Sequence, residues 1–119
     1  MRLAVLMIED SFFSADLNVR EVKKAGVEVD YRMVSSKKSM AVALKEQKWD
    51  IIICNTSMPN FTALMALKVR NKINRNIPFI IVSEDDEEVI YKTKEKEYNA
   101  FLPKDRLQEL GVLVCSLII

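Results

Sequence analysis

Residues 50–55, DIIICN, decide the fold of this chain. An unbroken apolar run between an aspartate and an asparagine is typical of a short strand buried on both faces. Similar runs occur at 3–8 (LAVLMI) and 79–82 (FIIV). Strands buried on both faces belong to parallel sheets that helices cover, so the sequence predicts an α/β fold.

The segment after the first run carries helix signals. Ser11 is placed to cap a helix at its start, and Gly26 to end it in a left-handed conformation. We expect Phe13, Leu17 and Val22 on the buried stripe of this helix.

The rest of the chain continues the alternation of strand and helix. Apolar and charged residues alternate over 27–33, which predicts a half-exposed strand. The expected later elements are a helix with Met40, Ala43 and Leu44 inside, a helix capped by Thr62 with Leu64, Leu67 and Ile73 inside, a helix over 84–97, a short strand at 101–102 and a helix capped by Asp105. The right-handed crossover rule then predicts one domain over residues 1–119, a doubly wound five-stranded parallel sheet with five helices.

The amino-acid composition argues against several classes of function. Without histidine, the chain has no Ser–His or Cys–His pair, no histidine zinc site and no phosphohistidine. Its two glycines leave no glycine-rich phosphate loop. The formal charge of +1, from 18 basic and 17 acidic residues, predicts no nucleic-acid partner.

The cysteines and apolar runs predict a cytoplasmic protein. Cys54 and Cys115 lie in apolar surroundings, where we expect buried, reduced thiols. The first apolar run is too short for a signal peptide, and the uncharged residues 111–119 are too short to span a bilayer. We therefore expect no membrane partner.

Polar side chains follow four of the predicted strands. Glu9 and Asp10 end the first, Asn55 the third and Ser83 the fourth, and Lys104 follows the fifth. Ligands of such sheets bind beyond the carboxyl ends of the strands, so we expect these residues to converge. Taken singly, each is more often a loop residue, a cap or a turn former. Carboxylates are magnesium ligands, and a hydroxyl and an ammonium hold phosphoryl oxygens.

The stretches LMIEDS, WDIIICNTSMP, IPFIIVSE and FLPKDRL resemble, in order and spacing, the receiver domain of response regulators. The resemblance covers essentially the whole chain and implies a flavodoxin-like fold in two-component signalling or a phosphorelay. It assigns magnesium to Glu9 and Asp10, with the backbone carbonyl of Ser57 as a further ligand. Ser83 and Lys104 become the phosphate-sensing pair, Phe101 the switch aromatic, and Asn55 takes the place of the phosphate-accepting aspartate.

Asn55 is the decisive departure from that family. A carboxamide is a poor nucleophile and lacks the charge of a metal ligand, so we expect no phosphorylation and only weak Mg²⁺ binding. In this interpretation Asn55 occupies the acceptor position without accepting phosphate, and its side chain forms a hydrogen bond with Lys104. The alternative is a phosphorylation-switched receiver, in which Asn55 replaces a native aspartate or another group accepts the phosphate. Two softer departures are Glu84, whose charge opposes a second anion, and Asn99, expected to be left-handed.

Function is therefore expected to reside in protein–protein contact rather than in catalysis. Glu9 and Asp10 lack an accompanying nucleophile or substrate loop, which argues against a magnesium-dependent enzyme. The expected partner is a sensor histidine kinase or another signalling protein.

The uncharged residues 111–119 predict a helix that is apolar all round. Either this helix is the end of a fragment, or its outer side, with Val112, Val114, Cys115 and Ile118, binds a partner or a second copy.

Overall fold

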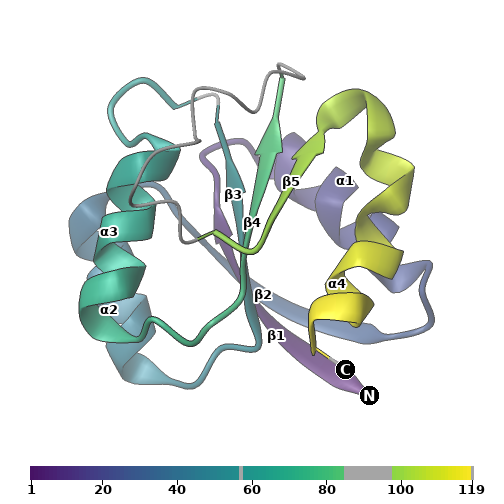
Figure 1. Cartoon of the computed structure of the whole chain (residues 1–119), viewed down its shortest axis with the longest axis horizontal. Helices are drawn as coiled ribbons and strands as arrows, with labels where there is room; N and C mark the ends of the chain where they lie inside the picture. The colour runs from purple at the N-terminus through teal and green to yellow at the C-terminus, as the bar shows by residue number, and fades with distance from the viewer. Residues whose placement is uncertain (57, 85–97, 119) are drawn as a thin grey trace.

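Five parallel strands form the centre of the molecule in the order β2-β1-β3-β4-β5 (Figure 1). The computed structural model describes residues 1–56, 58–84 and 98–118. The strands are β1 (Arg2–Ile8), β2 (Glu28–Val34), β3 (Ile51–Asn55), β4 (Phe79–Ser83) and β5 (Ala100–Pro103). Strands β3 and β4, which are apolar up to their last residues Asn55 and Ser83, lie next to each other in the sheet and are fully buried, as the sequence predicts.

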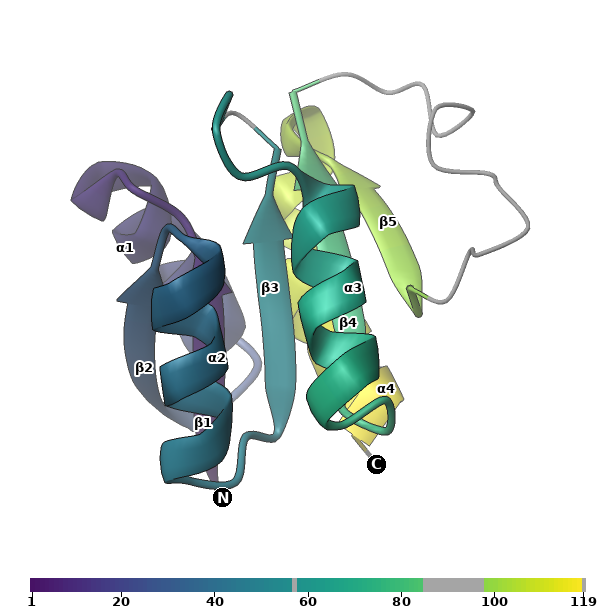
Figure 2. The ribbon, with the colours of Figure 1, turned by 90° about the vertical axis from the view of Figure 1, so that its left-hand side faces the viewer.

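Helices cover both faces of this sheet. Helices α2 (Lys37–Glu46) and α3 (Ala63–Ile73) lie side by side on one face (Figure 2), and α1 (Phe12–Lys23) and α4 (Leu110–Ile118) pack on the other (Figure 1). A 3₁₀ turn, η2 (Lys104–Glu109), leads into α4. The predicted α/β doubly wound fold is confirmed, with four α-helices among the described residues. Of the helix expected over 84–97, residues 85–97 lie outside them.

Two hydrophobic cores result, one on each face of the sheet. Met40, Leu44 and Leu67 are buried on the α2–α3 side, together with Trp49. On the other side, Val19 and Val22 of α1 pack with Val114 of α4. Because helices bury both faces, the central strands are apolar without alternation, whereas the edge strand β2 alternates apolar and charged residues in sequence and is only partly buried.

Some of the helix caps and left-handed residues predicted from the sequence are confirmed. The Ser11 and Thr62 side chains cap α1 and α3, and Gly26 has a φ of 89°. The left-handed conformation expected of Asn99 is wrong, because its Oδ1 instead accepts a hydrogen bond from the Phe79 N–H at 2.8 Å.

The cap expected of Asp105 is also wrong. The chain enters the 3₁₀ turn at Lys104, directly after β5, with Pro103 at the cap position and no side-chain cap bond. Asp105 therefore lies inside this turn rather than in front of a helix.

The buried face of α1 differs from the expected one. Ala15, Asn18, Val19 and Val22 form its inner stripe at helical spacing. Phe13 and Leu17 lie off this stripe and are 74% and 38% exposed, so their predicted burial is wrong. Leu64 of α3, 37% exposed, is likewise outside the core, whereas Leu67 is inside. None of the described helices is long and apolar enough to cross a membrane.

Candidate functional site

The polar residues predicted at the strand ends do meet at one edge of the sheet. Strand β3 pairs with β1 through Cys54 and Ile8, and with β4 through Asn55 and Val82. Strand β4 pairs in turn with β5, where Ser83 lies opposite Pro103. All strands run in the same direction, so Glu9, Asn55, Ser83 and Lys104 follow one another along this edge.

Glu9 is an almost fully buried carboxylate at the end of β1, 1% exposed. Its Oε2 accepts hydrogen bonds from the backbone N–H groups of Asp10 at 2.8 Å and Ser11 at 3.3 Å. Its Oε1 has no hydrogen-bond partner within residues 1–56, 58–84 and 98–118. The Asp10 side chain is exposed beside it. The loop thus fixes one carboxylate oxygen of Glu9 and leaves the other available.

Asn55 ends β3 and is fully buried. Its Nδ2 donates to the Met7 Sδ at 3.8 Å, and thioether sulfur is a weak acceptor. Its Oδ1 has no hydrogen-bond partner among the described residues. The expected bond to Lys104 is not formed, because Lys104 is held elsewhere.

Lys104 forms an ion pair with Glu84, Nζ to Oε1 at 2.7 Å. The Lys104 side chain is 23% exposed, whereas the Glu84 side chain is 62% exposed and reaches in from the rim. Ser83 is buried and accepts a hydrogen bond from the Thr56 hydroxyl, Oγ to Oγ1, at 3.3 Å. Thr56 was not singled out from the sequence, although its place directly after Asn55 is the available signal.

The donors at this edge fit a hard divalent cation only loosely. Glu9 Oε1 and Asn55 Oδ1 are buried oxygens without partners in the part of the chain that the structure describes, and Mg²⁺ prefers oxygen ligands. Asp10 adds a second carboxylate nearby, but the third donor is a neutral amide. The structure brings together no group of three carboxylate, thiol or imidazole side chains within residues 1–56, 58–84 and 98–118. The backbone carbonyl expected of Ser57 lies outside those residues.

Cys54 is buried next to Asn55 and is no substitute nucleophile. Burial raises the pKa of its thiol, and the charge of Glu9 raises it further. The nucleophilic form of cysteine is the thiolate, so this thiol is inert at neutral pH.

The switch aromatic and the last helix occupy different surroundings. Phe101 is partly buried in β5 and packs against the core on the α2–α3 side. In α4, Val114 is fully buried in the opposite core, so its expected place on an outer interface is wrong. Val112 is 74% exposed, and Cys115 and Ile118 are intermediate.

Exposed aromatics were missed by the sequence prediction. Phe12 and Phe13, at the start of α1, are 78% and 74% exposed. They follow directly on the loop that carries Glu9 and Asp10, so a large apolar surface borders the site. Neither residue belongs to the inner stripe of α1, and the sequence gives no local signal of this, because neighbours such as Asn18 and Val19 are both buried on that stripe.

Comparison with known proteins identifies one family. The profile of the response regulator receiver domain matches residues 5–114. Comparison with curated proteins gives no match.

Solved structures share the fold at low sequence identity. A response regulator receiver domain from Francisella is 22% identical, with 98% of this chain and 96% of that chain covered and a TM-score of 0.78. The receiver domain of a sensor histidine kinase from Pseudomonas aeruginosa, solved with magnesium in its active-site cleft, is 17% identical, with 99% and 98% covered and a TM-score of 0.77. The response regulator TrrA from Thermotoga maritima, solved with Mg²⁺ and BeF, is 17% identical, with 97% and 98% covered and a TM-score of 0.76.

Proposed function

From the premise that this chain belongs to the response regulator receiver domain family of two-component signalling, we propose that it is a receiver that is not phosphorylated and signals through protein–protein contact. The observation that carries this proposal is the fully buried carboxamide of Asn55 at the phosphoacceptor-equivalent position. Phosphoryl transfer needs an ionised carboxylate or another activated nucleophile. The amide supplies neither, and burial keeps solvent from it.

The ion pair next to Asn55 supports the same conclusion. A phosphate-sensing lysine must be available to a phosphoryl oxygen, but Lys104 already has the Glu84 carboxylate at 2.7 Å. A phosphoryl group would have to displace the Glu84 carboxylate from Lys104. It would then still be repelled by the negative charge of that carboxylate nearby. In this proposal Ser83 and Lys104 keep the positions of a phosphate-sensing pair without that role, and Phe101 is a packing residue.

A weak magnesium site belongs to the proposal. Glu9, Asp10 and the amide oxygen of Asn55 would hold the ion, with the backbone carbonyl of Ser57 as the further ligand that family resemblance assigns. When bound, the cation would neutralise the buried carboxylate. We propose no catalytic role for it.

Exposed apolar side chains supply the proposed contact surface. Phe12 and Phe13 border the site on α1, and Val112 is 74% exposed on α4, which packs against α1. Aromatic side chains are enriched at protein interfaces. The proposed partner is a sensor histidine kinase or another cytoplasmic signalling protein. A homodimer through α4 would use Val112, Cys115 and the exposed part of Ile118, without Val114.

The phosphorylation-switched alternative is favoured by four residues that keep the family's residue types. These are the acidic pair Glu9 and Asp10, together with Ser83 and Lys104. Intact-mass spectrometry after incubation with Mg²⁺ and acetyl phosphate separates the two functions. We expect the Asn55→Asp variant alone to gain a phosphoryl group. A phosphorylated wild-type chain would sink the proposal, and the modified residue would then have to be mapped.

A further inference from the structure

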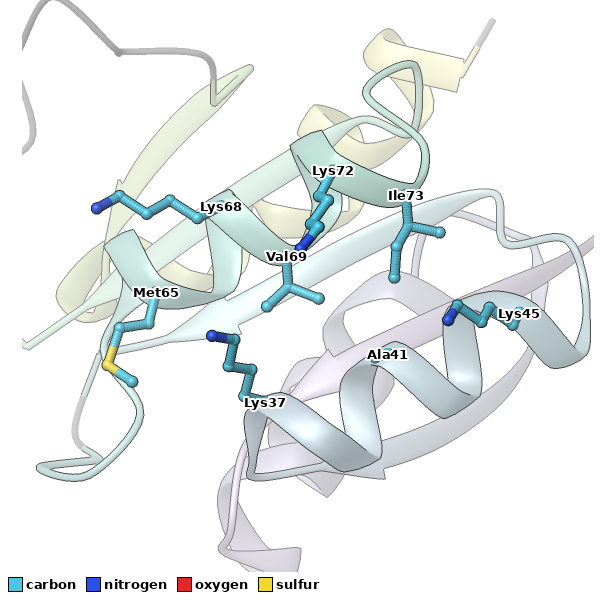
Figure 3. A pocket seen from close by; sticks show the side chains of 8 residues that line it. All are labelled: Lys37, Ala41, Lys45, Met65, Lys68, Val69, Lys72 and Ile73. Atoms are coloured by element: carbon cyan, nitrogen blue, oxygen red, sulfur yellow. The ribbon is translucent and has the colours of Figure 1, made fainter.

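A groove of about 730 Å³ runs between α2 and α3 and shares no lining residue with the strand-end site. Four lysines border it, Lys37 and Lys45 on α2 and Lys68 and Lys72 on α3 (Figure 3). All four are exposed. From its geometry we propose that this groove is a docking site for an acidic amphipathic helix of a partner protein.

The floor of the groove is apolar. Ala41 of α2 and Val69 and Ile73 of α3 lie between the lysines (Figure 3). Lys37, Ala41 and Lys45 follow one another at intervals of four residues, so they lie in a row on one face of α2. Two such stripes facing each other make an elongated trough with an apolar bottom and cationic edges.

The cationic edges have no counter-charge within the described chain. The ion pairs between described residues involve none of these four lysines, and no acidic residue lines the groove. The whole chain carries a net charge of only +1, so this concentration of positive charge is local. Glutamates on both flanks of an incoming helix would complement it.

The dimensions suit a short helix. Lys37 and Lys45 are separated by two turns, which is about 12 Å along α2. A helix with apolar residues at three- and four-residue spacing would place its stripe on the floor and its acidic flanks at the lysines.

Other occupants fit less well. A small ligand is usually oriented by a few polar groups inside its pocket, and the floor here offers only apolar side chains. Nucleic acid would contact the lysines but leave the apolar floor uncovered. A membrane surface is flat or convex on this scale and would touch only the edges of the trough.

The test uses the full chain and a fluorescent helical peptide of about 14 residues, roughly four turns. Leucines form one stripe of the peptide and glutamates flank it. We expect micromolar binding by fluorescence anisotropy. Lys68→Glu/Lys72→Glu should weaken binding at least tenfold, and Ala41→Phe, which fills the floor but keeps every lysine, should do the same.

Matched controls separate the groove from general electrostatics and from the strand-end site. Lys23→Glu/Lys24→Glu makes the same charge change at the end of α1, on the other face of the sheet, and should bind within twofold of wild type. Asn55→Asp should also bind as wild type, because the inference does not rest on the proposed function. Circular dichroism checks that each variant is folded.

Several outcomes overturn the proposal. One is no binding by the wild-type chain, and another is equal binding of a peptide with the same composition in scrambled order. Equal loss in the α1 control, or full binding by Ala41→Phe, would show that the groove is not the site. Binding to phosphatidylserine vesicles in place of the peptide, lost in Lys68→Glu/Lys72→Glu, would make the surface a membrane contact instead.

Discussion

Asn55→Asp should make the stability of the domain depend on pH and on magnesium. The substitution keeps the shape of the side chain but adds a carboxyl at a fully buried position. Glu9, also buried, lies at the end of the neighbouring strand β1. Desolvation and a nearby carboxylate both disfavour the ionised form, so the pKa of the new carboxyl should rise.

The size of the effect follows from linkage. A rise in pKa from about 4 in the unfolded chain to about 6 in the folded one costs about 3 kcal/mol of unfolding free energy above pH 6. Because the folded pKa is the higher one, the penalty is absent below about pH 4 and grows as pH rises through about 6. For a domain of this size, the melting temperature at pH 7.5 should fall by roughly 10 °C.

Magnesium should reverse part of this loss. An ion present at ten times its dissociation constant stabilises the folded state by about 1.4 kcal/mol. The wild-type chain should gain less, since its amide brings no charge to the ion.

The assay is thermal unfolding between pH 4 and 8, with magnesium or with a chelator. Asn55→Ala is the matched control, because it loses contacts without adding a titrating group. The plot of its melting temperature against pH should run parallel to that of wild type. If Asn55→Asp also runs parallel to wild type, the position is solvated, and the inference that residue 55 is sealed from solvent is refuted.

Three further predictions concern the scaffold. Gly111→Ala should destabilise by about 1–2 kcal/mol in urea titrations despite better helix propensity, since a Cβ there would lie 2.6 Å from a backbone oxygen of α1. Asn99→Ala should cost about 1–3 kcal/mol by the same assay, because the Phe79 N–H loses its acceptor; an unchanged midpoint would contradict this. With a thiol reagent at neutral pH, Cys115 should react in the folded protein and Cys54 only after unfolding, because burial raises the pKa of the Cys54 thiol. Mass spectrometry reads the labelled residue, and rapid labelling of Cys54 would be the contrary result.

The strands and the strand-end site were predictable because each depends on short, continuous stretches. A run as short as that of β3, bounded by Asp50 and Asn55, favours a buried strand over a helix, and parallel strands bring their carboxyl ends to one edge. Sequence alone could not identify the inner face of α1. Phe13 and Leu17 have helical spacing, as Ala15, Asn18 and Val22 do, and only packing against α4 selects the second stripe.

Contacts between distant segments were the other limit. Asn99 reads as a turn former, but its side chain satisfies a backbone N–H at the start of β4, twenty residues earlier. The groove lysines come from two helices whose adjacency depends on strand order, so no local pattern shows that they share a surface.

Asn55 and Glu84 are best understood together. A neutral amide at position 55 gives Lys104 no anionic partner within the site, and Glu84 supplies that charge from the rim. With its carboxylate 62% exposed, this pair is worth at most about 1 kcal/mol, so it positions Lys104 without locking the site. Because no covalent phosphate would then shift the state of the site, control of the proposed signal would fall to the abundance and affinity of its partners.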